Sequence, residues 1–352
     1  MSELLERILE IHLHPETGTP YWLERERELG FSLRRRVQYM DDLYELGPFD
    51  LQVLHERPLA DFIPKGLLHQ RRLITGETGG ATGAPKTTAF FEEEFQAAFV
   101  EPFLVTTGWE TPVADGHWLW LGPSGPHIIG KVARQIALAT TGCDGFSVDF
   151  DPRWYRVLTE GSLARQRYLD HLVRQAVHIL RQQDIRFLFS TPVMLTALVP
   201  IMDDASKRAI EFVYLGGMPV GPATLNELGD AFPNARFLTG YGNTLFGVSH
   251  EVRPHRPDHT LQSYFPPAGR LVLRLVSMNR NTSDSERLRN VVNEGERGQV
   301  VMHRLDESCF LANVMERDCG IRVAASGSEG VDGVKDPQPV PDARFRVENG
   351  IY

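Results

Sequence analysis

Glycines, hydroxyls and a lysine gather in one short segment of the chain. Residues 78–86 read TGGATGAPK and contain the residues able to bind an anion: Thr78, Gly79, Gly80, Thr82, Gly83 and Lys86. Glycines let the backbone approach an anion closely and direct successive N–H groups toward it. Hydroxyls add hydrogen bonds, and the lysine adds positive charge. The segment indicates a polyphosphate-binding loop, and for the loop alone a flexible surface turn is an alternative of about equal weight.

Two common phosphate motifs do not fit this loop. The Walker pattern requires Gly and Lys to be adjacent and followed by Ser or Thr, whereas Ala84 and Pro85 separate Gly83 from Lys86. The dinucleotide fingerprint GxGxxG is also absent from the loop. A nucleophile elbow of the GxSxG type is absent as well, and Ser124 lacks its context.

A group of histidines raises the alternative of a metal site. His250, His255 and His259 lie within ten residues, but Pro254 and Pro257 break the segment and the spacing suits no single helical face. We expect solvent-exposed loop histidines here and no metal-ligating residue.

Composition and charge exclude several classes of function. The chain has 352 residues and a formal net charge of -9, so we expect no nucleic-acid partner. No segment approaches the roughly 18 apolar residues of a membrane-spanning helix, and nothing resembles a signal peptide. Three cysteines without CxxC spacing indicate reduced thiols. We therefore expect a cytoplasmic protein without a membrane partner.

The loop must be positioned by the elements around it. Residues 1–70 have mainly helical periodicity, and a short apolar strand at Leu73-Ile74 leads into the loop, which an acidic helix over Glu92–Val100 follows. After residue 110, apolar strands alternate with helices, which predicts a largely parallel sheet covered on both faces. The strands are Trp118–Leu121, Arg186–Ser190, Glu211–Leu215 and Ala235–Leu238; the helices are Lys131–Thr140, Arg165–Gln183 and Ala223–Phe232.

The pattern changes near residue 265. Arg270–Val276 and Gln299–Arg304 read as strands separated by turns, which predicts a small antiparallel subdomain. We expect an α/β core with a helical N-terminal segment over 1–265 and a β-rich subdomain over 266–352. Thr239–Gly247 is expected to be a loop, and the proline-rich last twenty residues are expected to be irregular.

The order of residues in the loop resembles the signature of adenylate-forming enzymes, usually written [ST]-[ST]-G-T-T-G-x-P-K. In this chain Gly79 replaces a hydroxyl residue and Ala81 replaces a threonine. Two later segments resemble further motifs of that superfamily in the same order. Residues 216–219 (GGMP) are similar to its GG-[AE]-P segment, and residues 241–244 (YGNT) are similar to its YGxTE segment.

Weaker similarities cover most of the chain. His127 and Gly130 are similar to the HxxG element beside the acyl pocket, and Asp318 falls where the superfamily places the aspartate that binds the ribose hydroxyls. The N-terminal layout resembles phenylacetate-CoA ligases and acyl-protein synthetases. The resemblance implies an α/β fold, namely the large N-terminal domain of adenylate-forming enzymes, with a parallel-sheet α/β part, a small antiparallel β subdomain and the mobile C-terminal domain missing or vestigial.

The resemblance also implies roles for individual residues. ATP would be the cofactor, and the loop residues Thr78, Gly79, Gly80, Thr82, Gly83 and Lys86 would hold its outer phosphates. The adenine and ribose would lie against Gly217, Met218, Tyr241, Gly242, Asn243 and Asp318. The acyl pocket would contain Trp118, His127, Gly216 and Gly240. Lys86, Thr244 and His127 would be the catalytic residues, with Thr244 at the α-phosphate.

One replacement concerns the metal. Leu245 occupies the position of the superfamily's glutamate, which holds Mg²⁺ against the phosphates. Mg²⁺ is still expected, and Glu77 and Glu251 are candidates for the substitute carboxylate.

Three functions follow as hypotheses. The first is ATP-dependent activation of a carboxylic acid, expected to be aromatic, as its acyl-adenylate, which passes to a partner enzyme such as a reductase. Truncated relatives of this kind occur in antibiotic pathways, including phenazine biosynthesis. The second is a non-catalytic module that binds a nucleotide or an aryl acid within a complex. The third is the acyl-protein synthetase component of an acid reductase. We also consider a homodimer.

Overall fold

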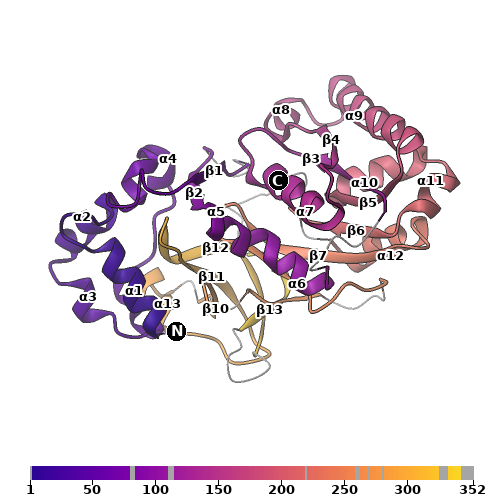
Figure 1. Cartoon of the computed structure of the whole chain (residues 1–352). Coiled ribbons are helices and arrows are strands. Elements are labelled where there is room, and N and C mark those ends of the chain that lie inside the picture. Colours follow the sequence, from indigo (N-terminus) through magenta and orange to yellow (C-terminus); the bar gives the residue numbers. More distant parts are fainter. Residues whose placement is uncertain are drawn as a thin grey trace.

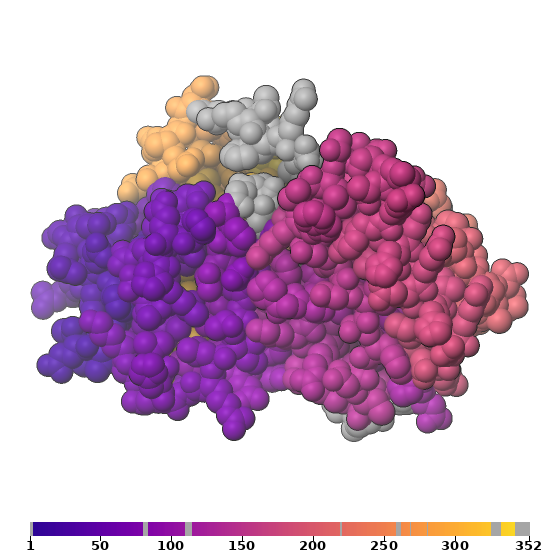
Figure 2. Space-filling model, turned by 90° about the horizontal axis from the view of Figure 1, so that it is seen from above, coloured from indigo at the N-terminus to yellow at the C-terminus, as the bar shows by residue number. Residues whose placement is uncertain are grey.

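Two lobes make up the chain. The computed structural model describes residues 2–79, 84–109, 115–218, 220–257, 262–267, 269–279, 281–324 and 332–341. One lobe contains the N-terminal helices beside an antiparallel sheet, and the other contains the larger sheet with its helices (Figure 1). Figure 2 shows the N-terminal residues, in indigo, at one end of the molecule and residues of the α/β lobe, in pink and orange, at the other.

A six-stranded sheet forms the centre of the α/β lobe. Its strand order is β4-β3-β5-β6-β7-β8, and all neighbouring pairs are parallel except β7–β8. The four strands predicted from apolar runs are β3, β5, β6 and β7, so the predicted parallel sheet is confirmed. The bounds are β3 His117–Gly122, β4 Phe146–Asp149, β5 Ile185–Ser190, β6 Phe212–Leu215, β7 Arg236–Asn243 and β8 Gly247–His250.

Helices cover both faces of this sheet because side chains alternate along each strand. On β3, Leu119 and Leu121 pack with one set of helices, whereas Trp118 and Trp120 pack with the other set. The first set is α9 Leu163–Gln182, α10 Pro192–Leu198 and α12 Pro222–Ala231; the second is α5 Glu92–Phe95, α6 Glu101–Thr107 and α7 Ile128–Thr141. Two short helices, α8 Pro152–Val157 and α11 Asp204–Ala209, complete this lobe.

The second lobe is built on a five-stranded antiparallel sheet in the order β10-β11-β12-β13-β9. The N-terminal helices share one apolar core with this sheet. Trp22 links the two parts, since its Nε1 donates to the carbonyl of Phe310 at 2.9 Å. The strands are β9 Ser263–Tyr264, β10 Leu271–Val276, β11 Arg297–Leu305, β12 Phe310–Val323 and β13 Gly333–Pro339; the helices are α1 Ser2–His12, α2 Pro20–Leu29, α3 Leu33–Arg36, α4 Val53–Glu56 and α13 Asp284–Arg289.

The structure corrects three predictions about local structure. Residues 239–247 are not one loop, because β7 continues to Asn243 and pairs with β8. The tail is not irregular throughout, because Gly333–Pro339 pairs with β12 as β13, while residues 342–352 lie outside the described part of the chain. The predicted helix Glu92–Val100 is α-helical only to Phe95 and continues as a π-turn over Gln96–Val100.

A buried charge network joins the two lobes. Arg304, whose side chain has no exposed surface, donates to Asp306, which directly follows β11, and to Thr88 Oγ1 at 2.9 Å on β2 (Thr87–Phe91). Arg270 donates to Asp306 Oδ1 at 2.8 Å and to the carbonyl of Phe246 at 2.6 Å. Burial alone would raise the pKa of Asp306, but the two arginines outweigh burial and hold this pKa below its usual value.

Of the helices in the described part of the chain, none is both long and apolar enough to cross a membrane.

Candidate functional site

The glycine loop leaves from an antiparallel hairpin. Strand β1 (Leu73–Glu77) pairs with β2, and the last pair before the loop is Glu77 with Thr87. Beyond that pair, the backbone N–H of Thr78 donates to the carbonyl of Lys86 at 2.9 Å, and the N–H of Lys86 donates to Thr78 Oγ1 at 2.9 Å. These bonds fix both ends of the loop. Gly80, Thr82 and Gly83 lie outside the described residues.

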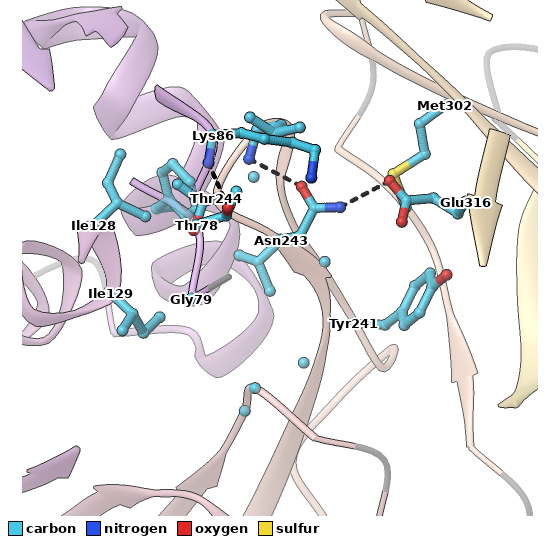
Figure 3. A pocket seen from close by; sticks show the side chains of 18 of the residues that line it. Thr78, Gly79, Lys86, Ile128, Ile129, Tyr241, Asn243, Thr244, Met302 and Glu316 are labelled. Atoms are coloured by element: carbon cyan, nitrogen blue, oxygen red, sulfur yellow. Dashed lines mark hydrogen bonds between the residues drawn. The ribbon is translucent and has the colours of Figure 1, made fainter. Parts of the chain in front are cut away.

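A cavity of about 420 Å³ opens beside this hairpin, and its walls come from both lobes. It brings together predicted site residues that lie far apart in the sequence, several of which are drawn in Figure 3. The predicted residues that line it are Thr78, Gly79, Lys86, His127, Gly216, Gly217, Gly240, Tyr241, Gly242, Asn243, Thr244 and Asp318.

Of the predicted site residues that the structure describes, two do not line this cavity. Trp118 is 2% exposed and packs within the aromatic core against Phe103 and Phe187. Its Nε1 donates to Thr140 Oγ1 at 2.8 Å, and Trp118 is not among the residues that line the cavity. Met218 packs against the apolar core on the side of α9, α10 and α12. Trp118 shares a face of the sheet with the lining residue Tyr214, but it packs near the C-terminal end of α7, whereas the lining residues of α7 lie in its first turns.

Tyr241 and Asp318 meet across the two sheets. The hydroxyl of Tyr241 on β7 donates to Asp318 Oδ2 on β12 at 3.3 Å. Burial raises the pKa of Asp318, and burial together with Asp318 raises the pKa of Tyr241 well above its usual range. Tyr241 is therefore a neutral donor at neutral pH, and Asp318 is an acceptor that still faces the cavity.

Glu316 is a site residue that the sequence analysis missed. It lines the cavity, and its Oε1 accepts a hydrogen bond from Asn243 Nδ2 at 2.9 Å, as Figure 3 shows. Burial first, and the nearby Asp318 second, raise the pKa of Glu316 to about 7. The signal was present in the sequence, since residues two apart on a strand share a face, and Glu316 lies two residues before Asp318.

Two glycines give the cavity wall its shape. Gly217 has a φ of +79°, which side chains rarely adopt, and it forms the turn after β6. A Cβ atom on Gly242 would lie 2.0 Å from the carbonyl oxygen of Gly247 on the paired strand. The close pairing of β7 and β8 therefore requires glycine at position 242.

One end of the cavity is apolar. It is lined by Phe99, Ile128, Val132, Tyr214 and Val248, none of which carries a charge. No motif in the sequence marks these five residues, because each belongs to a segment with the pattern of ordinary core. This end can accommodate a ring or a chain of hydrocarbon.

His250 lies behind this apolar end. Its Nε2 is 2.7 Å from the hydroxyl of Tyr214, and both side chains are buried. The expectation that His250 is solvent-exposed is therefore wrong, because pairing with β7 places it inside the lobe. Burial lowers the pKa of His250 to about 3, so the imidazole is neutral at physiological pH.

His127 stands at the start of α7, beside the loop. It is the N-cap residue of that helix and is 7% exposed. Burial, and then the positive charge of Arg153, lower the pKa of His127. A neutral His127 can donate or accept one hydrogen bond in the cavity without adding charge.

Neither of the two carboxylates expected to replace Leu245 as a Mg²⁺ ligand is available in the cavity. Leu245 is 3% exposed and supplies only hydrocarbon. Glu251 is committed to Thr239 and to His255, at 2.9 Å and 2.8 Å, and does not line the cavity. Glu77 is paired with Arg153 at 2.7 Å. Among the described residues, no group of three or more His, Cys, Asp or Glu could hold a metal ion by itself. His259 lies outside those residues.

A Mg²⁺ ion that arrives with nucleotide phosphates needs only one or two protein carboxylates. Glu316 meets that requirement, because it lines the same cavity as Lys86 and the end of the loop. The residues present therefore fit a phosphate-borne Mg²⁺, although not at Glu77 or Glu251.

Comparison with known proteins supplies the fold. No protein-family model matches this chain, and no curated protein matches it. Among solved structures, it is similar to 2-hydroxyisobutyryl-CoA ligase in complex with 2-HIB-AMP and CoA, with a TM-score of 0.62 and 12% identity. That match covers 95% of this chain and 65% of the ligase, so the chain spans about two-thirds of the ligase's length.

Weaker matches include ATP-bound MatB from Rhodopseudomonas palustris, with a TM-score of 0.47 and 14% identity over 74% of this chain and 47% of MatB. The luciferase-like enzyme of the mealworm Zophobas morio has a TM-score of 0.43 and 15% identity over 74% of this chain and 56% of that enzyme. The similarity to the CoA ligase shows that this chain has the fold expected above, with a parallel α/β sheet and an antiparallel sheet.

Proposed function

We propose that this chain belongs to the adenylate-forming superfamily and activates a carboxylic acid with ATP, giving an acyl-adenylate and pyrophosphate. The observation that carries the proposal is the convergence in one cavity of segments from three parts of the sequence. The loop ends at Thr78 and Lys86, the strand end at Tyr241–Thr244 and the β12 carboxylate Asp318 all line it. The order of these segments along the chain resembles the order of the superfamily's motifs.

ATP would be held along the length of the cavity. The loop backbone at Thr78 and Gly79, with Lys86, would bind the outer phosphates, and Thr244 would meet the α-phosphate. Tyr241 would stack on adenine beside Gly217, and Asp318 would accept from the ribose hydroxyls. In this arrangement, the Tyr241–Asp318 hydrogen bond fixes the carboxylate before the nucleotide arrives.

The reaction is a single displacement. A carboxylate oxygen of the acid attacks the α-phosphorus, the bond from that phosphorus to the bridging oxygen breaks, and pyrophosphate leaves with the electron pair. Lys86 and Thr244 stabilise the developing charge, and His127 orients the acid as a neutral donor. When bound, Mg²⁺ would offset phosphate charge, and Glu316 would hold it.

The acid in this proposal is aromatic. The apolar end of the cavity offers the rings of Phe99 and Tyr214 and no charge, which suits a planar hydrocarbon. The acyl group would pass to a partner enzyme such as a reductase, as in antibiotic pathways that include phenazine biosynthesis.

Exchange of labelled pyrophosphate into ATP tests the proposal. We expect exchange that depends on an added aromatic acid and falls by about a hundredfold or more in Lys86→Ala, because a charge at the leaving phosphates is lost. The control Lys65→Ala removes an exposed lysine that precedes β1 and does not line the cavity, and it should keep full exchange.

The second candidate is a module that binds nucleotide without turnover. The specific observation that favours it is Leu245, a buried hydrocarbon at the position of the usual metal ligand. Binding of ATP without exchange for any aromatic or fatty acid, alone or with extract of the producing cell, would establish this alternative and reject activation.

A further inference from the structure

One cation in the wall of the cavity has no part in the mechanism above. Among the described residues that line the cavity, Lys86 and Arg317 are the two that carry a lysine or arginine side chain. The proposed function uses Lys86 for the outer phosphates and leaves Arg317 without a role. Three linked phosphates carry several negative charges, which is more than one lysine can balance.

A bulge in β12 allows Arg317 to reach the cavity. Where β11 pairs with β12, the single residue Val300 lies opposite the three residues 316–318. Regular alternation would direct the middle residue of the three away from the face that the outer two share. A bulge breaks that alternation and re-aims a side chain, and all three residues line the cavity.

The backbone of the bulge is held in place. The carbonyl of Glu316 accepts a hydrogen bond from Gln299 Nε2 at 2.7 Å, and the carbonyl of Arg317 accepts one from the backbone N–H of Val340 at 2.7 Å. The side chain of Arg317 is exposed. Its main chain is therefore fixed at the wall of the cavity, whereas its guanidinium group can rearrange around a ligand.

The carboxylates on either side of Arg317 are bonded to other residues. Glu316 accepts from Asn243, as Figure 3 shows, and Asp318 accepts from Tyr241. Within the described part of the chain, the guanidinium group of Arg317 makes no hydrogen bond and no ion pair. A guanidinium group offers five N–H donors in a planar fork, so Arg317 can bind an anion without breaking either carboxylate contact.

The position of Arg317 lies between the sites proposed for the ribose and for the outer phosphates. It directly precedes Asp318, the residue proposed for the ribose hydroxyls. Its charge also reaches Lys86: burial first, and Arg317 second, lower the pKa of Lys86, against the effect of the carboxylates Glu316 and Asp50. An anion between two cations that repel each other is stabilised by both.

We propose that Arg317 binds the α-phosphate of ATP and keeps hold of the same group in the acyl-adenylate. This inference rests on the proposed function. The α-phosphate is the phosphate attached to the ribose, so a residue between the ribose site and Lys86 is placed for it. A guanidinium group matches two phosphate oxygens, keeps its charge at physiological pH and stabilises the charge that develops when the acid attacks.

Charge balance within the protein is the competing explanation. If Arg317 only offsets Glu316 and Asp318, its loss disturbs the ribose carboxylate and weakens every ligand that carries ribose. If Arg317 binds the α-phosphate, its loss weakens AMP and leaves adenosine unchanged, because adenosine has the same ribose and no phosphate. Adenosine and AMP therefore separate the two explanations.

Isothermal titration calorimetry with adenosine, AMP and inorganic pyrophosphate tests this proposal on the full chain, without Mg²⁺ so that metal binding does not enter. In Arg317→Gln we expect AMP affinity to fall about tenfold or more, as the loss of a charged hydrogen bond predicts, with adenosine unchanged and pyrophosphate within about threefold. Arg317→Lys, which keeps the charge, should recover most of the AMP affinity.

Two comparison variants complete the test. Lys86→Ala should show the opposite pattern, with pyrophosphate weakened and AMP nearly unchanged, because Lys86 is assigned to the outer phosphates. The matched control Arg236→Gln removes an exposed arginine at the start of β7 that does not line the cavity, and it should leave all three affinities unchanged.

The outcomes distinguish this inference from the proposed function. The Arg317 assignment is overturned, and the proposed function stands, if Arg317→Gln binds AMP as wild-type protein does, if it loses adenosine by the same factor, or if Arg317→Lys is as weak as Arg317→Gln. If Arg317→Gln loses AMP alone but wild-type protein shows no acid-dependent pyrophosphate exchange, the α-phosphate site stands and the proposed function fails. If wild-type protein binds neither adenosine nor AMP, both are rejected.

Discussion

Replacement of Glu316 by Gln should stabilise the protein, and more so as the pH rises. Glutamine keeps an oxygen that accepts from Asn243 Nδ2, so the 2.9 Å hydrogen bond can remain. What disappears is the cost of ionising a carboxyl group that burial and Asp318 hold at a pKa of about 7, compared with its ordinary value of 4.5. Below the ordinary value the carboxyl is protonated in both folded and unfolded chains, so neutral Glu316 costs nothing there.

The magnitude follows from proton linkage. Between the two pKa values the folded chain binds more protons, so stability falls as the pH rises through this range and stays low above about 7. A difference of about 2.5 pKa units corresponds to about 3 kcal/mol at most. Because Glu316 borders an open cavity, we expect about 1–3 kcal/mol of stabilisation at pH 8 and roughly a quarter of that at pH 5.

Urea unfolding at pH 5 and pH 8 measures this difference. The control Glu160→Gln changes an exposed carboxylate after α8 and should shift stability equally at both values. An equal effect of Glu316→Gln at the two pH values would refute the reasoning, since it would mean that this carboxyl group titrates in the folded chain as it does in the unfolded chain.

Three further predictions address the scaffold and the nucleotide. Gly242→Ala should destabilise the protein by about 3 kcal/mol or more in thermal unfolding, because its Cβ would clash with Gly247, whereas Gly221→Ala, with no atom within 4 Å, should change little. Asp306→Ala should cost about 3–5 kcal/mol in urea unfolding, because it leaves buried arginines unpaired. Asp318→Asn should lower affinity for ATP and AMP by the same factor, about tenfold in calorimetry, because both nucleotides carry the ribose.

The controls for these variants come from the same chain. Arg25→Ala breaks the surface pair with Glu28 and should change stability by less than about 1 kcal/mol. If Asp306→Ala cost no more than Arg25→Ala, the buried network would not join the lobes as described. Loss of ATP affinity with AMP affinity intact in Asp318→Asn would contradict the assignment of this residue to the ribose.

The parallel sheet could be predicted from the sequence because its strands are short apolar runs buried on both faces. Arg186–Ser190 and Glu211–Leu215 differ from the observed β5 and β6 by one residue at one end. Strand β4 was missed, since only Val148 among its four residues is buried and it lies at the edge of the sheet. Strand β13 was missed because proline cannot donate a backbone hydrogen bond within a sheet, and this segment contains Pro337 and Pro339. Both prolines lie beyond Val334 and Lys335, the two residues of β13 that pair with β9.

The site could be predicted as far as local order in the sequence describes it. The order of the loop, Tyr241 and Asp318 along the chain can be read from the sequence, but their proximity follows only from the cavity that they line together. Arg153 was missed, and His250 was wrongly expected to be solvent-exposed, for another reason. Each acts through a partner distant in sequence, Glu77 for Arg153 and Tyr214 for His250, and no local pattern encodes such a pair.

The shared core of the N-terminal helices and the antiparallel sheet affects how the chain is synthesised. Helices within residues 2–62 bury their apolar faces against a sheet whose first strand begins at Ser263, about 200 residues later. At typical rates of translation those helices wait roughly 10–40 s for their partner, whereas every strand of the parallel sheet has already emerged. The α/β lobe is therefore expected to fold first on the ribosome, and the first-made segment is the one most exposed to chaperones and proteases until the last strands arrive.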